Sequence, residues 1–319
     1  MKKGFSIGVD LGGTNIKAGL VRNDGIRPEI VLKKSVPTRL TGSAADICRD
    51  IAGLCGDICR DAGISLSDVG SIGVGSPGSV SGGVVHNAEN LGFSEVPLRD
   101  MISELVGSEI SVSLANDANA AAYGELVAGC GVGCDSIVAI TLGTGVGGGI
   151  VLDGKIVEGH NGAAGEIGHI IINNGGRLCG CGCRGCLEAY CSATALIDIT
   201  RETMSRRPDS LLHAISSESG VDGKTAFDAA RLGDTAAIEI IEEYIDNLAA
   251  GVASVIQMFQ PEIVCIGGGI SKEGEGLVAP LREKVYSMVY QDVSIEKTKI
   301  VAAQLGNDAG IIGAASIPC

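Results

Sequence analysis

Apolar residues recur every three or four positions in five stretches of the chain, which is the period of an α-helix that buries one face. The pattern is clearest over 235–259, where Pro261 predicts the end of the helix. The predicted helices span 43–62, 118–128, 187–205, 235–259 and 309–316.

Glycine-rich turns separate shorter apolar runs that are typical of buried strands. The runs 7–21 and 138–151 share one plan: a strand, a turn of glycine and threonine, and a second strand. Two copies of one hairpin suggest a duplicated domain. Further strands are expected at 263–266, which leads into three glycines, and at 300–303.

The composition fits an α/β enzyme. The 319 residues include 45% hydrophobic residues and 49 glycines, and this length can bury two cores of about 150 residues each. The net charge of −14 is dispersed along the chain, so nucleic acid and membrane surfaces are disfavoured as partners.

The sequence favours a cytoplasmic location. Asp10 interrupts an apolar run that would otherwise imitate a signal peptide, and no run approaches the roughly 20 apolar residues of a membrane span. Twelve cysteines in such a protein are better explained as reduced thiols plus a metal site than as disulfides.

The segment 166–188 concentrates thiols, one imidazole and carboxylates among glycines. Three cysteines and a histidine joined by short loops are the ligand set of a closed, tetrahedral structural zinc site. Buried or disulfide-paired cysteines are the alternative, but this run offers no helix or strand face that would bury thiols. The side chains concerned are Glu166, His169, Cys179, Cys181, Cys183, Cys186 and Glu188.

This segment resembles the central signature of the ROK sugar kinases, in which Gly-Glu-Ile-Gly-His is followed by Cys-x-Cys-Gly-x-x-Gly-Cys-Leu-Glu. The resemblance implies a zinc ion held by His169, Cys179, Cys181 and Cys186. Cys183 departs from the family pattern, which usually has no thiol there. The sequence leaves open whether Cys181 or Cys183 is the ligand.

The run from Asp10 to Lys17 resembles the first phosphate motif of the same family and of actin-like kinases. Its glycines let backbone N–H groups approach the phosphates of ATP, and Asp10 is placed to hold hydrated Mg²⁺. A plain hairpin turn is the alternative. The resemblance assigns ATP binding to Asp10, Gly12, Gly13, Thr14, Asn15, Lys17, Thr144, Gly145, Gly267, Gly268 and Gly269.

The run 143–148 also matches the dinucleotide fingerprint Gly-x-Gly-x-x-Gly. That fingerprint requires a helix directly after the glycines, whereas a strand and a turn are expected here. The run 149–155 imitates a P-loop, but Ile156 occupies the place of the Mg²⁺-binding serine or threonine.

Asp117 is the strongest catalytic candidate. It follows an apolar strand and opens an alanine-rich helix, whose dipole favours an ionised carboxylate. Taken alone it would be a helix N-cap. The resemblance instead implies a general base that takes the proton of the attacking sugar hydroxyl. The implied sugar contacts are Asn90, Asn116, Glu166, His169 and Glu188.

The resemblance spans the chain and implies the two-lobed, actin-like (ribonuclease H-like) α/β fold, with ATP and sugar in the cleft between the lobes. We expect one lobe from 1–117 plus 302–319, and a larger lobe from 118–301 that carries the zinc site. The implied activity is ATP-dependent phosphorylation of a hexose by a homodimer or homotetramer.

Glucose is the first candidate for the acceptor, with other hexoses and N-acetylhexosamines as alternatives. Glu89 and Ser81 replace the family's usual proline and aspartate in the sugar loops, so the acceptor stays open. A sugar-sensing repressor would carry a DNA-binding domain before the first phosphate motif, whereas the first strand is expected here by Phe5. A zinc hydrolase would require an open metal position.

Overall fold

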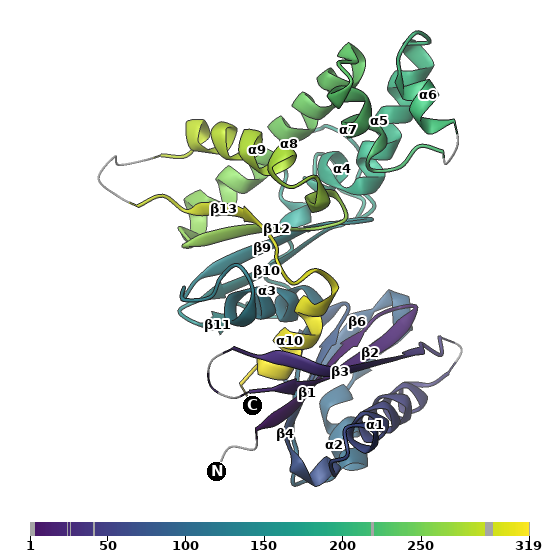
Figure 1. Cartoon of the computed structure of the whole chain (residues 1–319), viewed down its shortest axis with the longest axis vertical. Helices are drawn as coiled ribbons and strands as arrows, with labels where there is room; N and C mark the ends of the chain where they lie inside the picture. The colour runs from purple at the N-terminus through teal and green to yellow at the C-terminus, as the bar shows by residue number, and fades with distance from the viewer. Residues whose placement is uncertain are drawn as a thin grey trace. The chain divides into compact units, whose positions relative to one another are not determined.

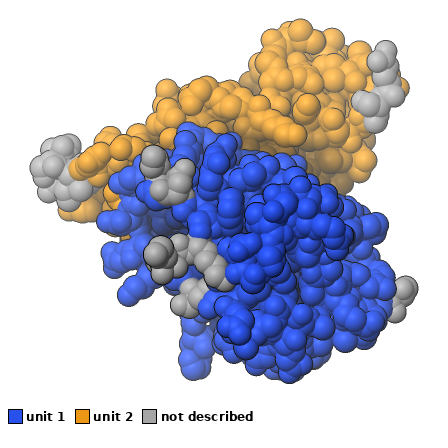
Figure 2. Space-filling model, turned by 60° about the horizontal axis from the view of Figure 1, so that its bottom comes forward, with its two compact units in different colours: residues 1–139, 149–165, 304–319 blue, residues 140–148, 166–303 orange. Residues whose placement is uncertain are grey.

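The computed structural model describes residues 4–23, 25, 27–40, 42–217, 220–290 and 296–318. By its internal contacts the chain divides into two compact units (Figure 2). Unit 1 comprises residues 1–139, 149–165 and 304–319, and unit 2 comprises 140–148 and 166–303. No helix among the described residues is long and apolar enough to cross a membrane.

The first five-stranded sheet has the order β3-β2-β1-β4-β8 (Figure 1). Strands β1, β4 and β8 are parallel, and β2 and β3 extend the sheet in antiparallel fashion. The carboxyl ends of β1, β4 and β8 therefore meet at one edge, where ligands of α/β folds are usually bound. The strands span Phe5–Leu11 (β1), Asn15–Arg22 (β2), Glu29–Pro37 (β3), Val69–Ser76 (β4) and Ser111–Asn116 (β8).

Helix α1 (Ala44–Asp61) and helix α2 (Leu98–Val106) pack together and help to close the core of unit 1. Ser43 and Asp46 form a reciprocal capping box at the start of α1. The helix buries its apolar stripe, including the thiols of Cys48, Cys55 and Cys59.

Helix α10 (Ala309–Ser316) lies against β1, β4 and helix α3 (Asp117–Ala128). Glycines permit this close approach: a Cβ on Gly73 would lie 1.7 Å from the carbonyl oxygen of Ala314, and a Cβ on Gly313 would lie 1.7 Å from that of Ala120. The last helix of the chain thus completes the unit that the first strand begins.

A small antiparallel sheet, β5-β6-β7, follows β4. Its strands span Ser79–Ser81 (β5), Val84–Ala88 (β6) and Phe93–Val96 (β7). Short 3₁₀ turns of unit 1 lie at Leu66–Asp68 (η1), Glu89–Leu91 (η2) and Gly306–Asp308 (η5).

The second five-stranded sheet has the order β11-β10-β9-β12-β13. Both sheets therefore have the same strand order: a hairpin (β1–β2 or β9–β10), one further strand beside its second strand, and two more strands beside its first. This shared order confirms the predicted duplication. The strands span Ile137–Leu142 (β9), Val146–Leu152 (β10), Lys155–Ile156 (β11), Ile263–Gly268 (β12) and Lys299–Ala302 (β13).

The remaining helices belong to unit 2, where α8 packs against α7 and α9. They span Glu188–Cys191 (α4), Ala193–Arg206 (α5), Leu212–Ser216 (α6), Thr225–Arg231 (α7), Thr235–Phe259 (α8) and Glu275–Met288 (α9), with 3₁₀ turns at Ile167–His169 (η3) and Ile270–Glu273 (η4).

The predicted helix over 187–205 is two helices. Ser192 has extended backbone angles and its hydroxyl accepts a hydrogen bond from the backbone N–H of Ala195 at 3.0 Å, so it ends α4 and caps α5. The chain passes from unit 1 to unit 2 after residue 139 and returns to unit 1 after residue 303, apart from the segment 149–165, which also belongs to unit 1. Helix α3 belongs to unit 1 because it packs against α10.

Candidate functional site

Asp117 is the first residue of α3, at the carboxyl edge of the first sheet. The helix cap is its neighbour Asn116, whose Oδ1 accepts hydrogen bonds from the N–H groups of Ala118 (2.9 Å) and Asn119 (3.2 Å). The Asn116 amide also donates to the carbonyl oxygen of Gly78 at 3.0 Å, leaving one N–H for a ligand. Asp117 therefore does not serve as the N-cap.

The first phosphate turn joins β1 to β2, at the same edge of the first sheet as Asp117. The N–H of Gly12 donates to the carbonyl oxygen of Asn15 at 3.0 Å, and the hydroxyl of Thr38 donates to the carbonyl oxygen of Gly12 at 2.7 Å. Thr38 was missed by sequence reasoning because no motif surrounds it. The Lys17 ammonium lies 3.3 Å from a carboxylate oxygen of Asp10.

Asn90 lies next to this turn. A Cβ built on Gly13 would be 3.6 Å from the Cβ of Asn90. Asn90 is exposed and lies in η2. One further close approach links the strand ends: a Cβ on Gly75 would lie 3.5 Å from the Cα of Asp117. Unit 1 therefore brings Asp10, Gly13 and Asn90 together at the edge that carries Asp117.

The second phosphate turn joins β9 to β10. Its backbone closes through a 3.0 Å hydrogen bond from the N–H of Gly143 to the carbonyl oxygen of Gly145, and the hydroxyl of Thr194 donates to the carbonyl oxygen of Thr144 at 2.8 Å. Thr194 is a second supporting hydroxyl that no sequence motif revealed. Sequence reasoning named only the turn itself.

Glu188 packs directly over this turn. Its Oε2 accepts a hydrogen bond from the N–H of Val146 at 3.0 Å, and a Cβ on Gly145 would lie only 2.4 Å from the same oxygen. Gly268, with φ +86°, comes equally close to the end of β9, since its Cβ would lie 2.3 Å from the carbonyl oxygen of Leu142. Unit 2 thus gathers Gly145, Glu188 and Gly268 around one turn.

The four predicted metal ligands form one group. The ligand atoms of His169, Cys179, Cys181 and Cys186 all lie within 4.8 Å of one another. The Sγ atoms of Cys181 and Cys186 are 3.7 Å apart, and the Sγ of Cys179 is 3.8 Å from the Nδ1 of His169. Zinc–sulfur bonds of about 2.3 Å in a tetrahedron place sulfur atoms about 3.8 Å apart, so these residues fit zinc.

Cys183 is not among these four residues. Its carbonyl oxygen accepts a hydrogen bond from the N–H of Cys179 at 2.8 Å, and its side chain is exposed. The backbone of the knuckle, which we define as residues 176–186, thus places Cys181 rather than Cys183 near the other three side chains.

Protonation of the knuckle thiols is uneven. A hydrogen bond from the backbone of Cys183, together with the thiol of Cys179, lowers the pKa of Cys181 to about 7. Burial raises the pKa of Cys186 to about 12. A metal ion must displace the proton of Cys186, so its affinity is expected to rise with pH.

His169 and Glu188 are predicted sugar contacts that also touch the side chains of the knuckle. The Nδ1 of His169 faces Cys179, whereas its Nε2 lies 4.0 Å from a carboxylate oxygen of Glu166. The thiol of Cys179 donates to the Oε1 of Glu188 at 3.4 Å. Glu188 therefore contacts both the second phosphate turn and the knuckle.

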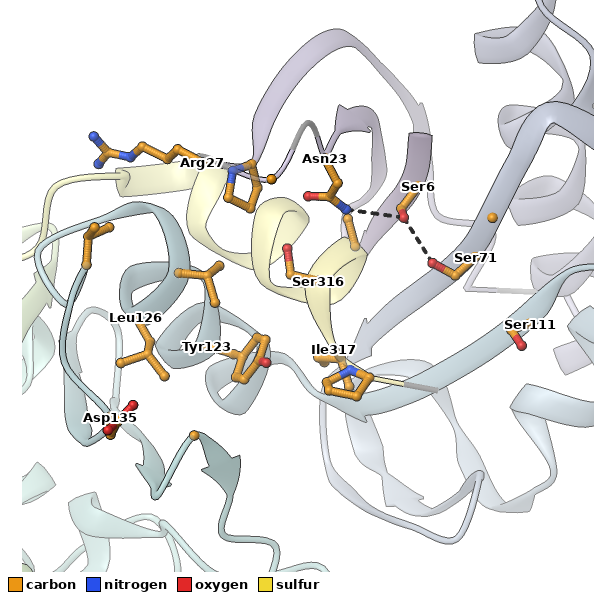
Figure 3. Close-up of a pocket in the computed structure, with 18 of the residues that line it drawn as sticks. Ser6, Asn23, Arg27, Ser71, Ser111, Tyr123, Leu126, Asp135, Ser316 and Ile317 are labelled. Carbon is orange, nitrogen blue, oxygen red and sulfur yellow. Dashed lines mark hydrogen bonds between the residues drawn. The ribbon is translucent and has the colours of Figure 1, made fainter. Parts of the chain in front are cut away.

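A cavity of about 940 Å³ lies elsewhere in unit 1 (Figure 3). Ser6, Ser71 and Ser111 line it from the amino-terminal parts of β1, β4 and β8, and a hydrogen-bonded chain joins Asn23, Ser6 and Ser71. Tyr123 lines it from the later part of α3. This cavity lies at the opposite sheet edge from Asp117, so it is separate from the predicted catalytic residue.

Comparison with known proteins finds relatives over nearly the whole chain. A sequence model of the ROK family matches residues 6–318. The glucokinase of Thermotoga maritima is 42% identical, over 98% of this chain and 96% of its own. The N-acetylmannosamine kinase of Yersinia pseudotuberculosis is 31% identical, over 98% and 97%. The crystal structure of a ROK family glucokinase from Streptomyces griseus in complex with glucose and AMPPNP has a TM-score of 0.77 and 36% identity, with 98% of each chain covered.

Proposed function

The chain belongs to the ROK family, and from this premise we propose that it is an ATP-dependent hexose kinase whose preferred acceptor is glucose. The observation that carries the proposal is the carboxyl edge of the first sheet. There Asp117 opens α3 beside Gly75, while Asn90 adjoins the glycine turn after Asp10. A base, a sugar-binding amide and a phosphate turn are the parts that this reaction requires.

We propose Asp117 as the general base. Its carboxylate takes the proton of the sugar hydroxyl as that oxygen attacks the γ-phosphoryl group, and ADP is the leaving group. Asn116 is the N-cap of α3, and the Oδ1 of Asp117 accepts a hydrogen bond from the N–H of Ala118 at 2.8 Å, while the helix dipole favours the ionised form of the carboxylate. Asn90 and the remaining N–H of Asn116 orient the sugar.

Each of the two glycine turns is proposed to bind phosphates of ATP. The first comprises Gly12, Gly13, Thr14, Asn15 and Lys17; the N–H of Gly12 closes the turn, so the N–H groups of Gly13 and Thr14 are the proposed backbone donors. The second comprises Thr144 and Gly145. Gly267, Gly268 and Gly269 line the adenine and ribose pocket. Asp10 would hold Mg²⁺, which when bound neutralises charge on the transferred phosphoryl group.

Glu166, His169 and Glu188 would bind the sugar hydroxyls, with zinc organising the wall that carries them. His169 suits both tasks, because its Nδ1 faces the ligand group and its Nε2 lies on the Glu166 side. Cys179 must lose its thiol proton to bind zinc, so it can no longer donate to Glu188. The Oε1 of Glu188 then becomes available to accept a hydrogen bond from the sugar.

The test is a coupled assay of ADP release with Mg-ATP and glucose, mannose, fructose, allose, N-acetylglucosamine or N-acetylmannosamine. We expect glucose to be preferred and Asp117→Asn to lower kcat by about 10²–10⁴-fold. Asp135→Asn, at the opposite sheet edge, is the matched control and should retain activity. Turnover with none of these sugars would contradict the kinase proposal and favour a sugar-binding regulator.

An N-acetylhexosamine is the second candidate acceptor. Glu89 and Ser81 depart from the family pattern in the loops that would read the sugar, and the N-acetylmannosamine kinase is a relative over nearly the whole chain. The same sugar panel separates the two, because only one class should show a high kcat/KM.

We also propose a cytoplasmic location and a homodimer or homotetramer. The location is supported by the need for ATP and by the eleven described cysteines, all of which are free thiols. The assembly rests on family resemblance, and light scattering during size-exclusion chromatography would measure it.

A further inference from the structure

The knuckle contains one more thiol than a tetrahedral site can use. Cys179 and Cys186 are buried, whereas Cys181 and the spare Cys183 are exposed. Elsewhere in the described chain, Cys130 and Cys134 are half-buried and the remaining thiols are buried. A dissolved oxidant therefore reaches Cys181 and Cys183 most readily.

The backbone bends sharply between these two exposed thiols. The N–H of Gly182 donates to the carbonyl oxygen of Cys179 at 2.9 Å, and the N–H of Cys179 donates back to the carbonyl oxygen of Cys183 at 2.8 Å. Gly182 has φ +88°, which glycine adopts without strain. Residues two apart are separated by less than about 7.6 Å even in an extended chain, and a bend brings their Cα atoms toward the separation of about 5.5 Å that disulfides favour.

We propose that Cys181 and Cys183 form a peroxide-sensitive thiol pair that controls whether zinc stays bound. The proposal rests on the proposed zinc site, and it gives a role to the thiol that the metal does not need. Cys181 is the ligand that is oxidised, and Cys183 is the resolving thiol that converts the oxidised ligand into a disulfide.

The reaction proceeds in two balanced steps. The thiolate of Cys181 attacks one oxygen of hydrogen peroxide, the O–O bond breaks, and the sulfur becomes a sulfenic acid while hydroxide leaves and is protonated to water. The sulfur of Cys183 then attacks the sulfur of Cys181, the S–O bond breaks, and a second water leaves with the proton of Cys183. Peroxide is reduced to two waters, two cysteines are oxidised to one disulfide, and Cys181 no longer offers a thiolate to zinc.

The sequence around the knuckle makes this testable by peptide mapping. Trypsin cleaves after Arg177 and Arg184, so residues 178–184 form one peptide that contains Cys179, Cys181 and Cys183, while Cys186 falls in the next peptide. A bond between Cys181 and Cys183 closes a loop within one peptide, whereas a bond to Cys186 would link two peptides.

Zinc-loaded protein is treated with hydrogen peroxide, and released zinc is followed with a chromogenic chelator. Wild type should release its zinc, and the peptide 178–184 should lose about 2 Da while Cys179 remains open to alkylation. Dithiothreitol with added zinc should restore metal binding. In Cys183→Ser the loop cannot form, the sulfenic acid is oxidised further, and the recovered zinc should fall at least about threefold. Cys130→Ser is the matched control and should behave as wild type.

Two results would overturn the pairing: a bond from Cys181 to Cys186 or Cys179 with Cys183 left reduced, or equal recovery of zinc by Cys183→Ser and wild type. Absence of zinc from the untreated protein would contradict the proposed zinc site instead. The disulfide map tests the thiol pair in either case.

Discussion

The absence of a side chain at Gly145 leaves room for Glu188, a proposed sugar-binding residue. A methyl group there would lie 2.4 Å from the Oε2 of Glu188 and must displace it. We expect Gly145→Ala to raise the KM for glucose at least about tenfold, because Glu188 would lose both its hydrogen bond from Val146 and its orientation. Steady-state kinetics checks this. Gly143→Ala is the control, since no atom lies closer than 4.0 Å to its added Cβ; equal effects of both would contradict the explanation.

Asp234 controls a helix start and gives a pH-dependent stability. Burial by itself would raise its pKa, but the N–H groups of Ala237 and Leu211 and the hydroxyl of Ser210 donate to the carboxylate and hold its pKa below the ordinary value. The stabilisation is therefore complete above the unfolded pKa of about 3.9 and is lost as the pH falls through the lower folded pKa.

We expect Asp234→Ala to lower the free energy of unfolding by about 1–2 kcal/mol at neutral pH, and this loss should shrink in acid. Urea titrations across pH measure it. The exposed Asp209 supplies the control variant, Asp209→Ala, which should show neither effect.

At the level of elements, the contact between α3 and α10 depends on absent side chains. A Cβ on Gly313 would lie 1.7 Å from the carbonyl oxygen of Ala120, and that backbone atom cannot rotate away. Gly313→Ala should therefore destabilise the protein by about 1–3 kcal/mol or more. Gly53→Ala, at an exposed position of helix α1 where no atom lies within 4 Å of the added Cβ, should instead stabilise it by about 0.5 kcal/mol. Thermal unfolding of both variants measures this. An unchanged stability of Gly313→Ala would show that α3 and α10 can move apart freely.

The elements with a strong period were predictable, and those that depend on tertiary contacts were not. Helices α8 and α10 begin and end at the predicted residues because caps and Pro261 mark them in the sequence. The break at Ser192 was hidden, because an apolar period continues across it. The short strands of the β5-β6-β7 sheet and helix α9 carry no comparable pattern and were not predicted.

The same distinction holds for the site. The cluster of His169, Cys179, Cys181 and Cys186 was predictable from residue type and spacing, and the structure brings Cys181 rather than Cys183 into it. In contrast, the hydroxyls of Thr38 and Thr194 support the two glycine turns from distant positions in the chain. Only folding brings such residues to the turns, so no local motif could indicate them.

For the molecule as a whole, removal of zinc should separate sugar binding from nucleotide binding. Glu188 and His169 contact the knuckle directly, whereas the turn after Asp10 belongs to unit 1. Chelation should raise the KM for glucose at least about tenfold and change the KM for ATP little. Kinetics of metal-free and zinc-reconstituted protein measure this, and a parallel loss of both affinities would contradict a structural role confined to the sugar wall.

The packing of α10 on β1 and β4 also has a consequence for biosynthesis. The ribosome makes β1 (Phe5–Leu11) long before it makes α10 (Ala309–Ser316), the helix that packs on it. Translation proceeds at about 5–20 residues per second, so the face of the sheet around Gly8 and Gly73 stays uncovered for on the order of tens of seconds. Unit 1 can therefore finish folding only after α10 has left the ribosome. Disruption of α10 should harm folding more than a change of equal size in an exposed loop.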